Sequence, residues 1–541
     1  MLKTGFFHYI AYTHFFTKNV FMIKKLTQTL LALTLVGGMT ACDKSMKGVD
    51  EGTTSATGDT YMSVTFSTTN PNSTRAAVKE DTEFNSIGEY VGRDEIKNVH
   101  VYVINLPQEN VDHKVFTTTT PNPDGDDTTN DFRTEAWKTT PGDKIVYVYV
   151  NISGTDIETE LNKATSKAAF EAANKKAYAL TANGAVKDVY AKYEGGKDII
   201  AMNSTKGVDL TVVAGVKKAE AEAMAPTTPK NRAKVSVRRL VAQAAVTSTA
   251  ATFEIKSGET TIATLGNLKW DVMQFEKTTF LAPQAEGTND AMLAKYCKSP
   301  SFDFVTDNAT YPFTSASDKY EYRAFTGAEV KTFTRNTDNK ENVKAIVATP
   351  MKFITETTHQ YGDKLAADGG TAPFTGYRKG NTTYVIVAAQ ITPDDAAWAE
   401  GEKANYQANG DLFLGVQDHK FYASPDKAKA ANKSTSDLGA DRDNVIKYTG
   451  GLCYYIAWLN PDVITDPVKS PVLRNNIYHV NVTGMKRLGY SGNPFNPGND
   501  NPKDPDDPTP DPTETLYPVD TYMAVEISVV NWGVHSYDQE F

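Results

Sequence analysis

Cysteine, tryptophan and histidine are scarce in this chain of 541 residues, which contains 3 Cys, 5 Trp and 8 His. The histidines stand apart from one another, and the chain has no His-Glu-x-x-His, Gly-x-Ser-x-Gly or phosphate-binding loop motif. These absences argue against a zinc peptidase, a serine hydrolase of the common type and a nucleotide hydrolase. We therefore expect no catalytic residues and no enzymatic activity.

The chain also offers little that could hold a metal or a cofactor. Cys297 and Cys453 form neither a metal motif nor a redox motif. Asp124–Asp127 (DGDD) lacks the glutamate spacing of a calcium loop and is more typical of a solvated acidic loop. We expect no metal and no cofactor. The two cysteines either pair in an oxidising compartment or lie buried as free thiols.

Positive charge is in short supply, with 56 Lys and Arg against 66 Asp and Glu and a formal net charge of -10. The basic residues are scattered along the chain rather than grouped. Because binding to phosphates requires a basic face, the sequence argues against a nucleic-acid partner.

Long apolar runs are scarce too, and the main apolar run lies near the N-terminus. Leu26–Val36 follows two lysines and precedes Met39–Cys42 (MTAC), which resembles the bacterial lipobox. A transmembrane anchor is the alternative, but the run is too short to span a bilayer. We expect residues 1–41 to be a signal peptide, with 1–21 as an upstream extension, and Cys42 to be lipidated.

Thr, Asn, Asp, Val and Tyr occur together in short runs, which favours β-structure joined by polar turns. A helix is expected from Thr155 or Asp156, because Thr155 and Glu158 have capping-box spacing. A short second helix is expected with Pro393 at its first position. The expected strands cover residues 98–105, 143–152, 208–216, 234–248, 264–282, 381–392, 410–423, 450–460 and 474–488.

The chain is long enough for two or more domains. We expect a mainly β protein with two β-domains that each carry a short helical insertion. The predicted limits are 76–285 for the first domain and 286–491 for the second. Residues 492–520 are rich in Pro and Asp, which predicts an extended, solvated linker, and residues 521–541 follow it as a strand.

Two segments near opposite ends of the chain are nearly the same. Thr60–Ser67 reads TYMSVTFS, and Thr521–Ser528 reads TYMAVEIS. Alternation predicts two half-buried strands in the same phase. The apolar faces would be Met62, Val64 and Phe66 in the first copy and Met523, Val525, Ile527 and Val529 in the second. Two ordinary strands of one sheet is the alternative, although an intramolecular strand would not need so long a tether.

Arg75 lies in a polar stretch between the first strand and the rest of the chain, and Ala76 follows it. Exposed loops with a basic residue next to a small one suit a trypsin-like protease. A single solvated arginine is the plainer interpretation of the same residues.

Several motifs in the second half form a recognisable set: Tyr377–Val387 (YRKGNTTYVIV), Gly410–Gly415 (GDLFLG), Arg474–Val482 (RNNIYHVNV), Ser491–Phe495 (SGNPF), the Pro/Asp linker and Tyr537–Phe541 (YDQEF). From Met62 to Phe541 the chain resembles the Bacteroidales fimbrillin family, and within it the major subunits of Porphyromonas-type short (minor) fimbriae.

The resemblance implies a lipoprotein precursor with two transthyretin-like β-sandwich domains. An arginine-specific protease would cut between Arg75 and Ala76 and remove the propeptide, residues 42–75, with the resident strand. The C-terminal strand of a neighbouring subunit would then fill the groove as a donor strand, with Trp532 extending the contact.

The resemblance also implies where the protein works and with what. Identical subunits would join head to tail in a cell-surface fimbrium that supports adhesion and biofilm formation. Accessory anchor and tip subunits and host or bacterial surface ligands would be further partners. The precursor would be held at the outer membrane by its lipid.

Two other classes of protein stay open. A monomeric surface lipoprotein that binds glycan or peptide would keep its N-terminal strand. An accessory fimbrial subunit at the tip would have no use for a donor strand.

Overall fold

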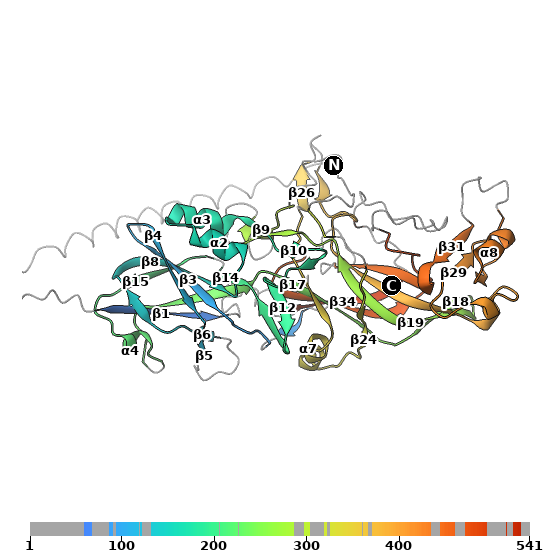
Figure 1. Cartoon of the computed structure of the whole chain (residues 1–541), viewed down its shortest axis with the longest axis horizontal. Helices are drawn as coiled ribbons and strands as arrows, with labels where there is room; N and C mark the ends of the chain where they lie inside the picture. The colour runs from blue at the N-terminus through green and yellow to red at the C-terminus, as the bar shows by residue number, and fades with distance from the viewer. Residues whose placement is uncertain are drawn as a thin grey trace, which may run out of the picture. The chain divides into compact units, whose positions relative to one another are not determined.

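The computed structural model describes residues 59–67, 86–89, 93–117, 119–121, 131–204, 206–224, 227–285, 297–302, 319–321, 325–359, 361–365, 371–433, 444–459, 471–494, 516 and 523–531. The protein is mainly β, as predicted (Figure 1). Within these ranges no helix has both the length and the apolar character needed to cross a membrane.

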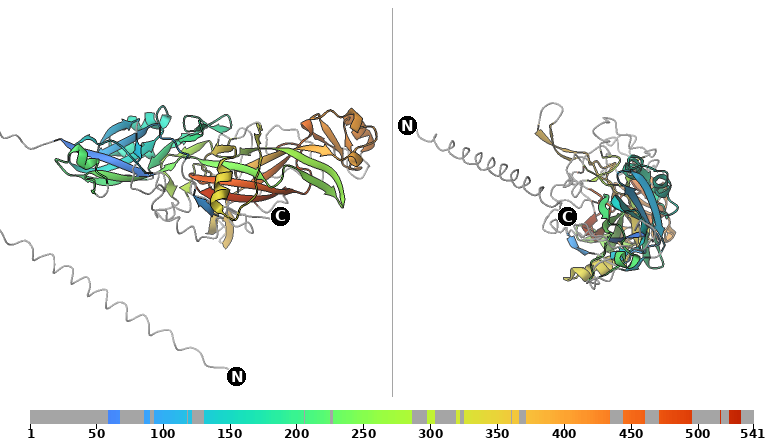
Figure 2. Two further views of the ribbon diagram at one scale, coloured as in Figure 1. Left: turned by 90° about the horizontal axis from the view of Figure 1, so that it is seen from below. Right: turned by 90° about the vertical axis from the view of Figure 1, so that its left-hand side faces the viewer.

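The first part of the chain forms a ten-stranded sheet in the order β4-β3-β8-β14-β16-β1-β6-β5, with β15 beside β8 and β7 beside β1. Its strands are β1 (Thr60–Ser67), β3 (Val99–Asn105), β4 (Asn110–Phe116), β5 (Thr120–Pro121), β6 (Asp131–Arg133), β7 (Trp137–Thr139), β8 (Gly142–Val150), β14 (Met202–Ser204), β15 (Val208–Val212) and β16 (Arg232–Arg239). Figure 2 shows these blue and green strands grouped together.

Two larger sheets follow. One has the order β2-β34-β33-β17-β24 with β25 beside β17, and the other has the order β18-β19-β28-β32 with β23 beside β19. The strands are β2 (Ser86–Glu89), β17 (Ala242–Ser248), β18 (Phe253–Ser257), β19 (Thr260–Met273), β23 (Ala328–Glu329), β24 (Lys331–Thr332), β25 (Met351–Ile354), β28 (Tyr384–Pro393), β32 (Leu452–Trp458), β33 (Asn476–Met485) and β34 (Met523–Asn531).

Short strands complete the β-structure as small sheets of two or three strands. They are β9 (Ala177–Ala179), β10 (Thr181–Ala182), β11 (Ala185–Val186), β12 (Ala191–Glu194), β13 (Lys197–Ile200), β20 (Thr278–Phe280), β21 (Gln284–Ala285), β22 (Cys297–Lys298), β26 (Tyr361–Leu365), β27 (Thr371–Thr375), β29 (Leu412–Gly415), β30 (Phe421–Tyr422) and β31 (Val445–Tyr448).

The first predicted helix begins where its cap indicates. Thr155 is the N-cap of α2 (Asp156–Asn162), and its hydroxyl accepts a hydrogen bond from Glu158 N at 3.2 Å. The helix ends after two turns, and Ser166 caps a second helix, α3 (Lys167–Lys175). The remaining helices are α4 (Lys218–Ala221), α7 (Asn339–Val347), α8 (Pro425–Ala431) and the 3-10 turns η3 (Asp395–Ala397), η4 (Lys403–Asn405) and η5 (Thr449–Gly451).

The helix predicted at Pro393 was wrong. Pro393 is the last residue of β28, and only the 3-10 turn η3 follows, with Asp394 as its N-cap. The Asp394 side chain accepts from Ala396 N at 3.0 Å, so the acidic residues that suggested a helix start instead cap a single turn.

The chain changes sheet at Leu240 and Val241. β16 is the last strand along the chain to join the ten-stranded sheet, whereas β17 pairs with β33 and β25 in another sheet. The sequence predicted one continuous strand over 234–248. It also placed the domain boundary at about residue 285, well beyond this change of sheet. The limits of the domains and their transthyretin-like topology stay predictions.

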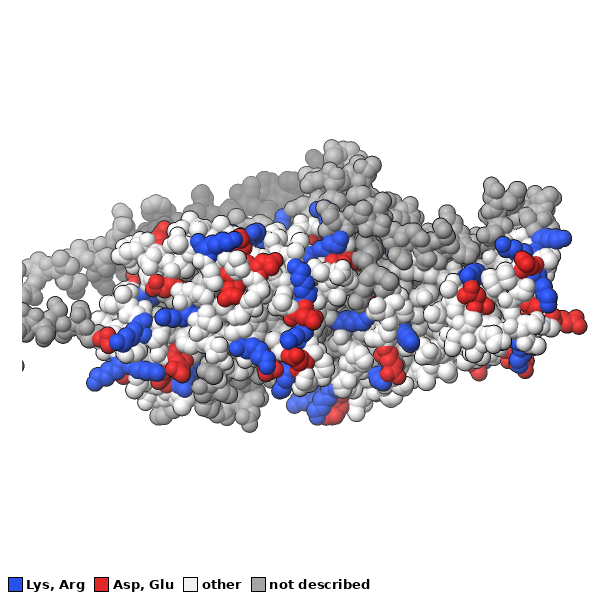
Figure 3. Space-filling model, in the orientation of Figure 1, with Lys and Arg blue, Asp and Glu red and all other residues white. Residues whose placement is uncertain are grey.

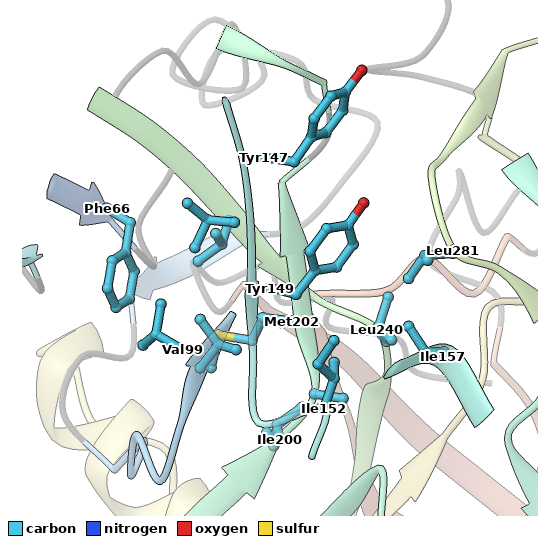
Figure 4. Packing of buried hydrophobic residues seen from close by; sticks show 14 of the residues in the cluster. Phe66, Val99, Tyr147, Tyr149, Ile152, Ile157, Ile200, Met202, Leu240 and Leu281 are labelled. Atoms are coloured by element: carbon cyan, nitrogen blue, oxygen red, sulfur yellow. The ribbon is translucent and has the colours of Figure 1, made fainter. Parts of the chain in front are cut away.

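Buried apolar residues gather in two main clusters, one under the first sheet and one around β19, β28 and β33. Figure 4 shows part of the first cluster, where Phe66 of β1 lies with Val99, Tyr149 and Met202 from other strands. Cys297 and Cys453 are both buried and are not joined to each other by a disulfide, so the structure favours the second of the two alternatives for the cysteines.

Candidate functional site

The first strand of the repeat, β1, lies inside the ten-stranded sheet rather than at its edge. On one side it runs parallel to β16, with Val64 opposite Ala233 and Phe66 opposite Val235. On the other side it is antiparallel to β7 and then to β6. A strand with neighbours on both sides has both rows of backbone groups in ladders. We call the space between β16 and β6/β7 the β1 slot.

The inner face of β1 is fully buried. Met62, Val64 and Phe66 are each 0% exposed and belong to the first core cluster. The Phe66 ring stacks on Phe132 of β6, with ring centroids 5.5 Å apart. Complete removal of these side chains from water is worth about 1.5–3 kcal/mol each, so the inner face anchors the strand.

The outer face of β1 is covered as well, which corrects the prediction of a half-buried strand. Ser63 is 0% exposed and Thr65 is 6% exposed. The Ser63 hydroxyl donates to the carbonyl oxygen of Ala221 in α4 at 2.7 Å and accepts from Arg232 Nε at 3.0 Å. The sequence signalled a polar face correctly, but α4 and the side chains around it exclude water from that face.

Residues outside the ladders also hold the backbone of β1. Thr134 N donates to Val64 O at 3.0 Å, and Val64 N donates to Thr134 Oγ1 at 3.1 Å. Tyr61 N donates to Val216 O at 3.0 Å, and Asn231 Nδ2 donates to Tyr61 O at 3.1 Å. Removal of β1 would leave these buried groups without partners unless another strand took the same place.

Basic residues line the outer face of the β1 slot. Arg133 is the cross-strand partner of Thr65 on β6, and Lys234 is its partner on β16. Arg232 lies opposite Ser63, and Lys138 of β7 lies opposite Tyr61. Sequence reasoning missed this arrangement because Arg133 and Lys138 are distant along the chain from Arg232 and Lys234, and both pairs are distant from β1. On the face of the molecule that Figure 3 shows, acidic and basic side chains are interspersed.

The second copy of the repeat lies in the other part of the molecule. β34 runs antiparallel to β33, with Val525 opposite Val482, Ile527 opposite Val480 and Val529 opposite Tyr478. It is also paired, in parallel, with β2. In this state the C-terminal strand is therefore part of its own chain's sheet.

The other predicted site residues cannot be placed. Cys42, Arg75, Ala76 and Trp532 lie outside the described residues, as does most of the Pro/Asp linker. No group of three or more His, Cys, Asp or Glu residues suited to a metal occurs within the described ranges.

Several titratable groups are buried away from the β1 slot. Burial raises the pKa of Glu276 to about 8, although its carboxyl group accepts from Ser301 N and the Ser299 hydroxyl. Burial lowers the pKa of His100 to about 4, and His100 Nδ1 lies 3.1 Å from His113 Nε2. These groups shape the dependence of stability on pH, and none of them faces the slot.

Comparison with known proteins finds similarity to fimbrial subunits. Residues 446–538 match the family model of the major fimbrial subunit protein type IV, fimbrillin, C-terminal. The chain is 33% identical over 542 residues to the minor fimbrium subunit Mfa1 of Porphyromonas gingivalis, which covers 96% of this chain and 100% of that protein.

Solved structures give more distant likenesses. A fimbrilin from Porphyromonas gingivalis W83 is 13% identical, with a TM-score of 0.40, over 89% of this chain and 99% of that one. A putative cell adhesion protein from Parabacteroides distasonis is 13% identical, with a TM-score of 0.40, over 88% of this chain and 100% of that one.

Proposed function

Because the chain belongs to the fimbrillin family of bacterial fimbrial subunits, we propose that it is a structural subunit of a fimbrial shaft, polymerised by exchange of its C-terminal strand. In this proposal the chain is exported as a lipoprotein precursor with its lipid on Cys42. An arginine-specific protease then cuts between Arg75 and Ala76, and β1 leaves with the propeptide.

The single observation that carries the proposal is the burial of β1 between β16 and β6/β7. β1 precedes the proposed cleavage position, and its inner face is 0% exposed at Met62, Val64 and Phe66. Loss of this strand would open an apolar slot inside a sheet. The chain holds a second copy of the strand, Thr521–Ser528, in the same phase.

The energetics favour refilling the slot. Met523, Val525, Ile527 and Val529 would contribute roughly 1.5–3 kcal/mol each on burial, or about 6–12 kcal/mol together before the cost of ordering the strand. Pairing of the donor backbone with β16 and β6/β7 would satisfy the groups that β1 leaves behind. Each subunit then accepts at one place and donates from another, so the contact does not close on itself and generates a filament.

A monomeric surface lipoprotein that binds glycan or peptide is the second candidate. The observation in its favour is the pairing of β34 with β33 and β2 of its own chain. In the proposed function the same pairing is the state of the subunit before exchange.

Electron microscopy of the purified full chain, before and after treatment with an arginine-specific protease, separates the two. We expect monomers before treatment and filaments afterwards, with Ala76 as the N-terminal residue. Treated protein that remains monomeric would favour the ligand-binding lipoprotein. Filaments whose subunits still begin upstream of Thr60 would contradict the removal of β1.

A further inference from the structure

We infer that Glu526 is a specificity-determining residue of the donor strand, read by the basic residues that flank position 65 of the β1 slot; this inference rests on the strand exchange proposed above. The two copies of the repeat carry the same residue at five of eight positions. Of the three differences, only Thr65 against Glu526 introduces a charge.

The register of β1 defines the surroundings of this charge. A donor strand in the place of β1 and in the same phase puts Glu526 where Thr65 stands. Lys234 is then its direct neighbour on β16, and Arg133 is its direct neighbour on β6. Neighbouring strands lie about 4.7–4.9 Å apart, and residues directly opposed on antiparallel strands have Cβ atoms about 4.5–5.5 Å apart, so a glutamate side chain reaches Lys234 on the parallel β16 and Arg133 on the antiparallel β6.

The resident strand makes poor use of this position. Thr65 is 6% exposed, and its hydroxyl is buried without a hydrogen-bond partner among the described residues. Arg133 donates to the carbonyl oxygen of Glu222 at 2.5 Å, while Lys234 is exposed. Neither makes an ion pair within the part of the chain that the structure describes. A carboxylate at this position gains two partners that a threonine hydroxyl cannot use as well.

The difference between Ser63 and Ala524 also favours a carboxylate at position 65. Ser63 accepts a hydrogen bond from Arg232 Nε at 3.0 Å, and the corresponding donor residue, Ala524, has no hydroxyl. Arg232 therefore loses one acceptor on exchange. It lies two residues before Lys234 on the same face of β16, within reach of a glutamate at position 65.

The Glu526 charge also has different cross-strand neighbours in the slot and in the place that β34 occupies in its own chain. There Glu526 stands opposite Asn481 of β33, which is neutral and 1% exposed. Transfer to the slot of a second copy replaces a neutral neighbour with Lys234 and Arg133. The direct cross-strand neighbours of Glu526 therefore favour the slot of a second copy over its own place beside β33, and added salt should weaken this preference.

Charge reversal tests the assignment in full-length chains treated with an arginine-specific protease, with filament growth followed by light scattering. We expect Glu526→Lys to slow growth by about tenfold or more, because like charges on adjacent strands repel. Lys234→Glu alone should slow growth similarly. The double variant, Glu526→Lys with Lys234→Glu, should grow within about threefold of wild type because the pair is restored with opposite signs.

Controls keep the inference separate from the proposed function. Lys114→Glu makes the same charge change as Lys234→Glu. Lys114 is exposed on β4, a strand remote from β1 in the strand order, so this variant should grow like wild type. Urea unfolding of each precursor identifies any variant that fails to fold, and Glu526→Gln, which removes the charge with little change in size, should slow growth by a few fold. Wild-type protein that forms no filaments would overturn strand exchange itself. Wild-type filaments with unchanged growth in Glu526→Lys, or a double variant no faster than the single ones, would overturn only the role of Glu526.

Discussion

Individual side chains of β1 differ in what they contribute. Phe66 is 0% exposed, stacks on Phe132 and lies in the first core cluster, whereas the Thr65 hydroxyl next to it is buried without a described partner. Deleting a buried ring leaves a cavity that the surrounding sheet cannot fully close. Phe66 is therefore the residue at which the contribution of β1 to the precursor is best measured.

Phe66→Ala should destabilise the precursor by about 3–5 kcal/mol. Urea unfolding of the uncleaved chain measures this loss. Val115→Ala on β4, where the side chain is 47% exposed, should stay within about 0.5 kcal/mol of wild type. After cleavage at Arg75 and exchange, the Phe66→Ala protein should match wild type because β1 is gone. An equal loss of stability in the assembled filament would show that β1 is still in place.

Glu276 makes stability depend on pH in the direction opposite to a paired carboxylate. Its pKa is raised by burial from 4.5 to about 8. Above pH 4.5 the unfolded chain releases this proton while the folded chain keeps it, so stability falls as pH rises from about 4.5 to about 8. The buried pair formed by Arg474 Nη2 and Glu356 Oε2, 2.9 Å apart, lies nearby and keeps a second carboxylate close to Glu276.

Glu276→Gln should remove this part of the pH dependence. The difference in unfolding free energy between variant and wild type should shift in favour of the variant by a few kcal/mol at most between pH 4.5 and 8, as measured by urea unfolding at several pH values. Glu259→Gln, at an exposed position, is the matched control and should leave the profile unchanged. A constant difference across the whole range would mean that Glu276 is ionised in the folded protein.

At the scale of elements, β34 is the strand with two possible places. In its own chain it lies between β33 and β2, so leaving requires two ladders to open. In the β1 slot of a neighbour it would again have partners on both sides. The proposed exchange would therefore open two ladders and form two others. Its free energy would depend on the side chains of the strand rather than on the number of ladders.

Deletion of residues 519–541 should give a subunit that accepts a donor strand and offers none. Mixed with wild-type protein and treated with protease, it should terminate filaments at one end and shorten them in proportion to its share. Electron microscopy of filament lengths over a range of mixing ratios is the measurement. Lengths that do not change with the ratio would argue against donation from the C-terminus.

Sequence patterns predicted the elements that neighbouring residues along the chain determine. Thr155 and Glu158 indicated the start of α2, and the alternation in Thr60–Ser67 gave the strand and its apolar face. The break between β16 and β17 was missed because Leu240 and Val241 are as apolar as the strands on either side, and only pairing with different sheets separates them.

The candidate site was only half predictable. Comparing the two copies of the repeat shows Thr65 against Glu526 in the sequence itself. Arg133 and Lys234 could not be found in that way, because they reach position 65 only through the pairing of β6 and β16 with β1. Strand pairing between distant segments, including that of β2 with β34, leaves no local signal.

At the scale of the whole molecule, the proposed cleavage would decide whether a subunit can accept a donor strand as well as offer one. While β1 stays attached it is held at high effective concentration next to its own slot. An incoming strand of similar apolar content gains little by competing with it. In the proposed assembly a precursor would therefore be able to donate before it could accept.

Arg75→Ala should stop assembly one step earlier than the C-terminal deletion. The variant should accumulate as a folded monomer after protease treatment, as measured by size-exclusion chromatography. In mixtures with wild type it should join a growing filament as a donor and never as an acceptor. Filaments formed by Arg75→Ala alone would show that removal of β1 does not trigger assembly.

The parallel pairing of β1 with β16 has a mechanical consequence for a filament built in this way. A donor strand in the orientation of β1 receives its linker at the Thr60 end, beside Val216, and runs toward the Ser67 end. Tension between subunits then pulls along the strand, across ladder bonds that lie at an angle to the force. The bonds share the load in shear instead of opening one after another like a zipper. Rupture requires many of them to fail together, so the lifetime of the joint under flow is set by a single large barrier.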